Sequence, residues 1–249
     1  MKYLLGELTW VEAEKRFKEI DIVILPIGSL EQHGRHLPLD TDAFDAYWLA
    51  KEVVSRVKVP QPLVLPPINY GISYHHLDFP GTVSISPQTL AQLVYEIALC
   101  LAKWNVKKLV IINGHGGNKP ALECAMQRIK KELGIFVCVE TGELIAKDKS
   151  KIIETKNDVH SGEYETSTSL ANREELVRKE EIKEEKLKFK SKWLEFDKGI
   201  PWGFRVKELS TSGVLGNPKK ASKEKGKKLW DLHINKLVEM IEELRKLKC

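Results

Sequence analysis

The stretch from residue 107 to residue 141 reads KKLVIINGHGGNKPALECAMQRIKKELGIFVCVET, and it decides the fold class. Its two ends, Lys107–Asn113 and Ile135–Thr141, are short apolar runs typical of buried strands. Between them lies an amphipathic stretch over residues 118–133, and Gly134 follows it as a C-cap. A strand, a helix and a second strand with short connections predict a parallel pair with a crossover helix, because parallel strands need such a connection.

The same alternation continues on both sides of this stretch. Asp21–Ile27 and the proline-interrupted run Leu63–Ile68 are further strand candidates. Helices are expected over residues 41–57, 87–104, 167–179 and 219–248. This order predicts an α/β protein with a three-layer α/β/α sandwich around a mostly parallel sheet. No repeat and no flexible linker interrupts it, so we expect a single domain over residues 1–249.

Composition excludes several classes of protein. With 249 residues, 42% hydrophobic and 30% charged, the chain has enough apolar content to fold, and none of its apolar runs approaches the ~20 residues of a membrane span. Glu7 interrupts the N-terminal apolar run too early for a secretory signal, so we expect a cytoplasmic protein without membrane contact. The net charge of +5 is modest, and the basic run at residues 219–228 lacks interleaved aromatic residues, which argues against nucleic-acid binding.

A first polar cluster follows the strand Asp21–Ile27. The loop reads GSLEQHGRHLPLDTD over residues 28–42 and contains Glu31, His33 and Asp42. Ligands of open α/β sheets bind at the carboxyl ends of the strands, where this loop lies. Imidazole and carboxylate together suit a divalent ion such as Zn²⁺, Mn²⁺ or Fe²⁺. The alternative is a polar loop whose aspartates cap the next helix.

Two more clusters are expected at the same edge of the sheet. NGHGGN at residues 113–118 holds His115 among glycines at the start of a helix. It could cradle a phosphate, but it matches neither common nucleotide-binding glycine motif, so a metal ligand fits better. DVHSGEYETS at residues 158–167 contains His160 and Glu163, which helix capping does not explain. Three such clusters together favour a metal site over three unrelated polar loops.

These three motifs, taken together, resemble the creatininase (creatinine amidohydrolase) family over nearly the whole chain. The resemblance implies an α/β/α sandwich, two divalent metal ions per subunit (Fe²⁺, Zn²⁺ or Mn²⁺), and hydrolysis of an amide C–N bond other than a peptide bond. It also implies a homo-oligomer, from dimer to hexamer. It places Glu31, His33, Asp42 and His115 on the family's metal-ligand positions, with Asp42 as the bridging carboxylate, and His160 on its catalytic histidine.

One position departs from the family pattern. Creatininases proper read N-G-H-x-E-N, and the glutamate ligates the second metal; this chain has Gly117 there. We infer that Glu163 replaces the missing ligand, and that Glu165 either orients His160 or the metal ligands or is a first-turn acid favoured by the helix dipole.

The departure also makes creatinine itself a less favoured substrate. The motifs are similar to those of archaeal formamide hydrolases that deformylate a ribosylaminopyrimidine phosphate on the way to riboflavin and deazaflavin, which is our first expectation. A creatinine amidohydrolase and a creatininase-like peptidase that trims a redox-cofactor precursor peptide are alternatives. A non-catalytic metal- or nucleotide-binding module is a further alternative, but it would have no use for a catalytic histidine.

Amide hydrolysis needs a proton donor for its poor leaving group, and we assign that role to His160. Tyr74, His75 and His76 are expected to line the pocket for a small-molecule substrate, although their segment could equally form a turn or an interface. Trp202 is a candidate lid over a planar substrate, or else part of a subunit interface.

Overall fold

The computed structural model describes residues 2–185, 187–188 and 203–248. Its sheet has four parallel strands in the order β2-β1-β3-β4. The strands are β1 (Ile22–Ile27), β2 (Leu63–Val64), β3 (Lys108–Asn113) and β4 (Phe136–Glu140). Strand β2 is much shorter than the run Leu63–Ile68, because Pro66 and Pro67 have no N–H to donate to a neighbouring strand.

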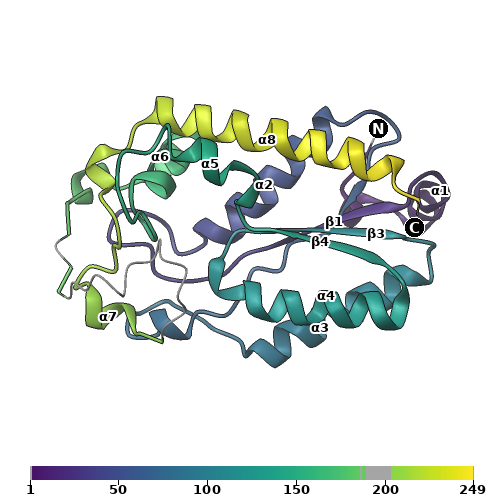
Figure 1. Cartoon of the computed structure of the whole chain (residues 1–249), viewed down its shortest axis with the longest axis horizontal. Coiled ribbons are helices and arrows are strands. Elements are labelled where there is room, and N and C mark those ends of the chain that lie inside the picture. Colours follow the sequence, from purple (N-terminus) through teal and green to yellow (C-terminus); the bar gives the residue numbers. More distant parts are fainter. Residues whose placement is uncertain (1, 186, 189–202, 249) are drawn as a thin grey trace.

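Helices cover both faces of the sheet, which confirms the three-layer α/β/α prediction. Helices α2 (Thr41–Arg56) and α8 (Lys223–Lys246) lie on one face, and α3 (Pro87–Ala102) and α4 (Lys119–Leu133) lie on the other (Figure 1). Alternate residues of β1 point to opposite faces: Val23 packs in the core beneath α3 and α4, and Ile24 packs in the core beneath α2 and α8.

Local signals explain where several helices begin and end. Ser86 caps α3 by accepting a hydrogen bond from the Thr89 N–H at 3.0 Å, and Gly134 ends α4 in the left-handed conformation with φ of 71°. A further helix, α1 (Trp10–Glu19), begins with a capping box in which Thr9 and Glu12 satisfy each other's backbone N–H groups.

Helix α6 (Glu163–Asn172) differs from the helix expected over residues 167–179. It begins earlier because the Asp158 carboxylate accepts hydrogen bonds from the N–H groups of Glu163 and Tyr164, at 2.8 and 2.7 Å. Between Asn172 and Lys179 the chain forms only short 3₁₀ turns, so the second half of that helix prediction is wrong.

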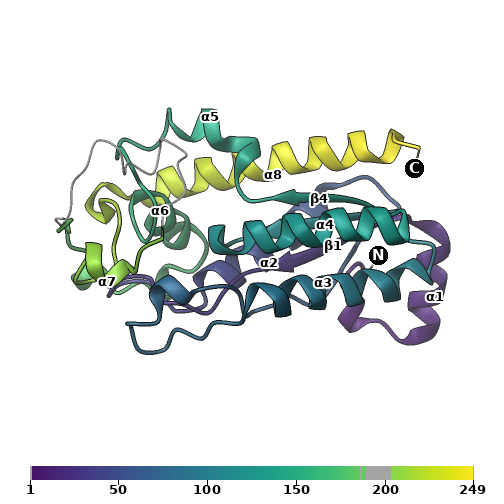
Figure 2. The same cartoon turned by 60° about the horizontal axis from the view of Figure 1, so that its bottom comes forward.

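The carboxyl ends of the strands face the end of the molecule that contains α6 and the short helix α7 (Val206–Leu209), away from the two chain termini (Figure 2). The short helix α5 (Ala146–Lys149) follows β4 on this side. Among the described residues, no helix combines the length and apolar character needed to cross a membrane.

Candidate metal centre

Six histidine and carboxylate side chains meet at the carboxyl ends of the strands. They come from the loop after β1, the first turn of α2, the loop after β3, the residues before α6, and α6 itself. All are buried except the last, which is partly exposed: Glu31, His33, Asp42, His115, His160 and Glu165.

Asp42 and Glu31 stand at the centre of this cluster. The Asp42 oxygens lie 3.0 Å from His33 Nε2 and 3.1 Å from His115 Nδ1. Glu31 lies 3.3 Å from His115 Nε2 and 3.7 Å from His160 Nδ1. Four overlapping sets of three side chains could each hold a metal ion, their ligand atoms lying within 4.8 Å of one another, and Glu31 belongs to three of these sets.

Three of the histidines are oriented in the same way. One ring nitrogen donates a hydrogen bond to a main-chain carbonyl: His33 Nδ1 to Glu31 O at 3.1 Å, His115 Nε2 to Ile72 O at 3.0 Å, and His160 Nε2 to Gln32 O at 2.7 Å. The other nitrogen of each ring faces the carboxylates. This is the arrangement of metal-ligating histidines, in which the second N–H is fixed by an outer partner.

Without a cation, two histidines of the cluster, His33 and His115, hold an extra proton. Burial opposes a charged His33 ring, but the carboxylates of Asp42, Glu165 and Glu31 together outweigh burial and raise its pKa to about 10. The pKa of His115 rises to about 9 in the same way, because the carboxylates of Glu31 and Asp42 outweigh the effect of burial. Burial raises the pKa of Glu31 to about 7.

Two buried oxygens of the cluster are left without a normal hydrogen bond. Within the described part of the chain, Glu31 Oε1 and Asp42 Oδ2 make only ion-pair contacts with histidines. A buried carboxylate is costly unless it is paired or coordinates a cation. The donor set and these two oxygens therefore fit divalent metal ions.

Two glycines allow α2 to approach the strand ends closely enough to bring Asp42 into the cluster. A Cβ atom on Gly28 would lie 2.2 Å from Ala43 Cα, and one on Gly114 would lie 2.3 Å from Asp42 O. Neither position has room for a side chain, so glycine is required for steric reasons after β1 and after β3.

The structure does not bring Glu163 into the cluster. Its buried carboxylate accepts hydrogen bonds from Lys225 Nζ at 2.6 Å and from Thr155 Oγ1 at 2.6 Å, and it belongs to none of the four candidate metal sets. Glu165 belongs to one of them, with His33 and His160. Residues two apart on a helix face different directions, so only one of these acids can point at the cluster.

The expected substrate residues have different positions. His75 stacks on His115 with ring centroids 5.7 Å apart, whereas Tyr74 is half-exposed. Trp202 lies outside the described residues. His76, expected with Tyr74 and His75 to line the pocket, is buried and lies 3.3 Å from Glu31. Adjacent histidines give no sequence signal to show which of them turns inward.

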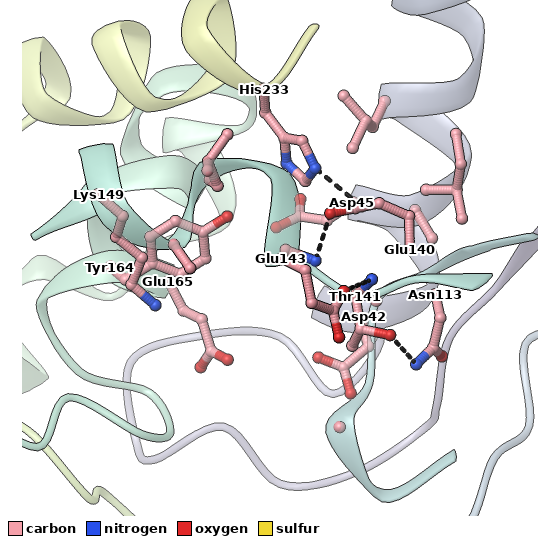
Figure 3. Close-up of a pocket in the computed structure, with 18 of the residues that line it drawn as sticks. Asp42, Asp45, Asn113, Glu140, Thr141, Glu143, Lys149, Tyr164, Glu165 and His233 are labelled. Carbon is pink, nitrogen blue, oxygen red and sulfur yellow. Dashed lines mark hydrogen bonds and ion pairs between the residues drawn. The ribbon is translucent and has the colours of Figure 1, made fainter. Parts of the chain in front are cut away.

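A cavity of about 690 Å³ opens beside the cluster. Asp42, His160 and Glu165 are among the residues that line it, and Figure 3 shows His233 reaching from α8 toward Glu140. The His233 Nε2 atom lies 2.9 Å from Glu140 Oε2. The cavity therefore gives a substrate access to one side of the cluster.

Asp45 also lines this cavity, on the wall formed by α2. It accepts a hydrogen bond from Asn172 at 3.0 Å, and burial raises its pKa to about 7. Of the described residues around the cavity, Lys149 alone is a lysine or arginine, and its Nζ lies 4.1 Å from the centre of the Tyr164 ring. The wall is thus richer in acids than in bases.

Comparison with known proteins gives a consistent family. The family model described as creatininase, creatinine amidohydrolase, matches residues 6–241. The mycofactocin precursor peptide peptidase of Mycobacterium ulcerans is 32% identical, covering 91% of this chain and 87% of that protein. The 2-amino-5-formylamino-6-ribosylaminopyrimidin-4(3H)-one 5'-monophosphate deformylase of Methanothermobacter thermautotrophicus is also 32% identical, but over 60% of this chain and 58% of that protein.

Solved structures agree with the fold. A structure titled creatininase Mn superposes with a TM-score of 0.81 at 26% identity, covering 98% of each chain, and a mutant creatininase of Zn–Zn type gives the same values. The crystal structure of a putative creatinine amidohydrolase from Bacteroides fragilis superposes with a TM-score of 0.86 at 25% identity, covering 100% of this chain and 98% of that one.

Proposed function

Because this chain belongs to the creatininase family, we propose that it is a metal-dependent hydrolase that cleaves an amide C–N bond in a peptide-derived substrate. The observation that carries the proposal is the shared orientation of His33, His115 and His160. Each fixes one N–H on a main-chain carbonyl and turns its other nitrogen toward buried carboxylates.

Glu31, His33, Asp42, His115 and Glu165 would hold two divalent ions, with Asp42 between His33 and His115. Glu165 takes the place that we first assigned to Glu163. When bound, such ions supply Lewis-acid activation of water and of the amide carbonyl. Mn²⁺, Zn²⁺ and Fe²⁺ all suit a set of imidazole and carboxylate ligands.

His160 would transfer the proton. Burial and the neighbouring His33 hold its pKa well below the usual range, so its ring is neutral at rest. Its Nδ1 atom can accept the proton released when water adds to the carbonyl carbon. It then gives that proton to the departing nitrogen as the C–N bond breaks, which an amine leaving group requires.

Two observations favour a peptide-derived substrate over the formylaminopyrimidine phosphate. The peptidase relative is 32% identical over 91% of this chain, whereas the deformylase of Methanothermus fervidus, which matches over 89% of it, is 28% identical. The described cavity wall also has several acids but one lysine, Lys149, so it offers little to bind a phosphate dianion.

A turnover panel tests the proposal. The protein is stripped with chelator, reloaded with Mn²⁺, Zn²⁺ or Fe²⁺ without oxygen, and given a mycofactocin precursor peptide, the formylaminopyrimidine ribotide or creatinine. We expect metal-dependent cleavage of the peptide, with kcat reduced at least ~100-fold in His160→Gln.

Formate release from the ribotide, with an intact peptide, would replace the peptidase proposal with a deformylase. A fully metal-loaded protein that cleaves none of the three would contradict the peptide assignment. Turnover that persists after chelation would contradict the metal-dependent mechanism itself.

A further inference from the structure

The side-chain amide of Gln32 lies among two histidines of the site and the loop that contains Gly213. Its Oε1 atom accepts a hydrogen bond from the Gly34 N–H at 2.9 Å. Its Nε2 atom lies 2.7 Å from His76 Nδ1, 3.0 Å from His160 Nε2 and 3.1 Å from Gly213 O. All of these distances are within hydrogen-bonding range, so the proton positions can be worked out from donor and acceptor chemistry.

The orientation of the amide is fixed by its two backbone neighbours. The Gly34 N–H can only donate, and the Gly213 carbonyl can only accept. Reversing the amide would bring two oxygens within 3.1 Å of each other and leave the Gly34 N–H facing an NH₂ group. The oxygen therefore faces Gly34, and the NH₂ group faces Gly213 and the histidines.

The main-chain carbonyl and the side-chain amide of Gln32 then fix the proton on the two histidine rings. His160 Nε2 lies 2.7 Å from the main-chain carbonyl of Gln32, so this nitrogen carries the ring proton. It therefore cannot accept a hydrogen bond from the side-chain amide. The amide NH₂ group therefore donates its two hydrogen bonds to Gly213 O and His76 Nδ1. Neutral His160 is left with its lone pair on Nδ1, and neutral His76 is left with its proton on Nε2.

We propose that Gln32 gives opposite roles to the two histidines beside Glu31: its main-chain carbonyl makes His160 present a lone pair to the site, and its side-chain amide makes His76 present an N–H. Both rings approach the same Glu31 oxygen, His160 Nδ1 at 3.7 Å and His76 Nε2 at 3.3 Å. Geometry alone would allow Glu31, His76 and His160 to share a metal ion. The amide excludes His76 from the ligands, because a ligating nitrogen needs a free lone pair.

The contrast with the other three histidines supports this assignment. His33, His115 and His160 each donate one N–H to a main-chain carbonyl, whereas His76 Nδ1 accepts a hydrogen bond from the Gln32 amide. His76 thus directs its Nε2–H toward the Glu31 carboxylate, 3.3 Å away. Gln32 is a positioning residue that acts through His76 and His160.

The backbone is shaped around this amide. Gly213 has φ of 93°, and a Cβ atom there would lie 1.8 Å from Gln32 Oε1. Two residues later, Leu215 binds the His160 backbone in both directions, with its O accepting from His160 N at 3.1 Å and its N donating to His160 O at 2.8 Å. The same short segment therefore positions both the Gln32 amide and His160.

Nitrogen NMR of the zinc-loaded protein tests the assignment without any variant. With ¹⁵N-labelled histidine, His76 is expected to show the Nε2–H tautomer, with neither ring nitrogen shifted as a zinc ligand. A His76 ring that carries its proton on Nδ1 and binds zinc through Nε2 would overturn the proposal.

Gln32→Glu is the sharpest variant, because it keeps the shape of the side chain and removes the NH₂ donor. We expect His76 to move its proton to Nδ1, kcat to fall about 10–100-fold, as for other outer partners of metal ligands, and two zinc ions to remain bound. Gln61→Glu is the matched control: the Gln61 side chain donates a hydrogen bond to Val54 O at 3.0 Å, and the residue lies just before β2, at the opposite end of the sheet.

A Gln32→Glu protein with the same His76 tautomer and the same kcat as Gln61→Glu would overturn the proposal. If Gln32→Glu does not fold, the wild-type spectrum still decides. The inference rests on the proposed function only for kcat, since the tautomers are read from the spectrum whether or not a peptide is cleaved.

Discussion

Glu163 and Glu165 lie two residues apart on α6, and replacing each with glutamine should affect different properties. We expect Glu165→Gln to weaken metal binding and Glu163→Gln to lower the stability of the fold. Glu165 faces the cluster, so Glu165→Gln removes a metal ligand. We expect the dissociation constant of the more weakly bound metal to rise at least ~100-fold, or about 2.7 kcal/mol. Burial raises the pKa of Glu165, so the neutral glutamine should leave the metal-free fold at least as stable.

Glu163 instead joins α6 to α8. Glu163→Gln leaves the Lys225 ammonium without its buried partner, although Lys225 keeps Glu154 at 2.7 Å. Breaking a buried pair costs about 3–5 kcal/mol, and the remaining partner reduces this to roughly 2–3 kcal/mol. At about 2–4 °C per kcal/mol for a chain of this size, Tm should fall by roughly 5–10 °C.

Thermal unfolding of the metal-free proteins and competitive metal titration measure the two effects separately. Glu154→Gln is the control, since that residue pairs with Lys225 but is largely exposed, and we expect it to change Tm little. The reasoning is refuted if Glu163→Gln loses metal affinity while Glu165→Gln keeps it, because that result would restore the ligand first inferred from the sequence.

Two further perturbations test the packing around the site. A Cβ on Gly117 would lie 2.4 Å from His115 Nε2, so Gly117→Glu should displace His115 and weaken metal binding at least ~10-fold; tighter binding in a metal titration would contradict this. Asp45 has a pKa of about 7 in the fold against 3.8 in the unfolded chain, so the fold holds a proton that the unfolded chain loses, and stability falls as pH rises from about 4 to 7. Asp45→Asn should remove this loss, worth at most about 4 kcal/mol, so its Tm advantage in metal-free melts should grow between pH 5 and pH 8 and then level off; an advantage independent of pH would contradict the assignment.

The layered fold and most of the cluster could be predicted from the sequence, because both depend on local patterns. Apolar runs followed by glycine loops place Glu31 and His115 at one edge of a parallel sheet whatever the details of packing. The start of α6 could not be predicted in the same way. It depends on Asp158, which lies five residues before the first helical residue and caps it from outside the helix.

The choice between Glu163 and Glu165 also lies beyond local pattern. It depends on how α6 is rotated against α8, and Lys225, 62 residues away along the chain, pairs with Glu163. The role of His76 depends on a contact with Gln32 across 44 residues. Only tertiary structure sets these side-chain directions.

The central claim is a two-metal centre, and anomalous X-ray diffraction at the metal absorption edge tests it most directly. Crystals of the metal-loaded protein should give two anomalous peaks among Glu31, His33, Asp42, His115 and Glu165, with Asp42 between them and no peak beside Glu163. A single peak, or none within this cluster at full metal loading, would contradict the account.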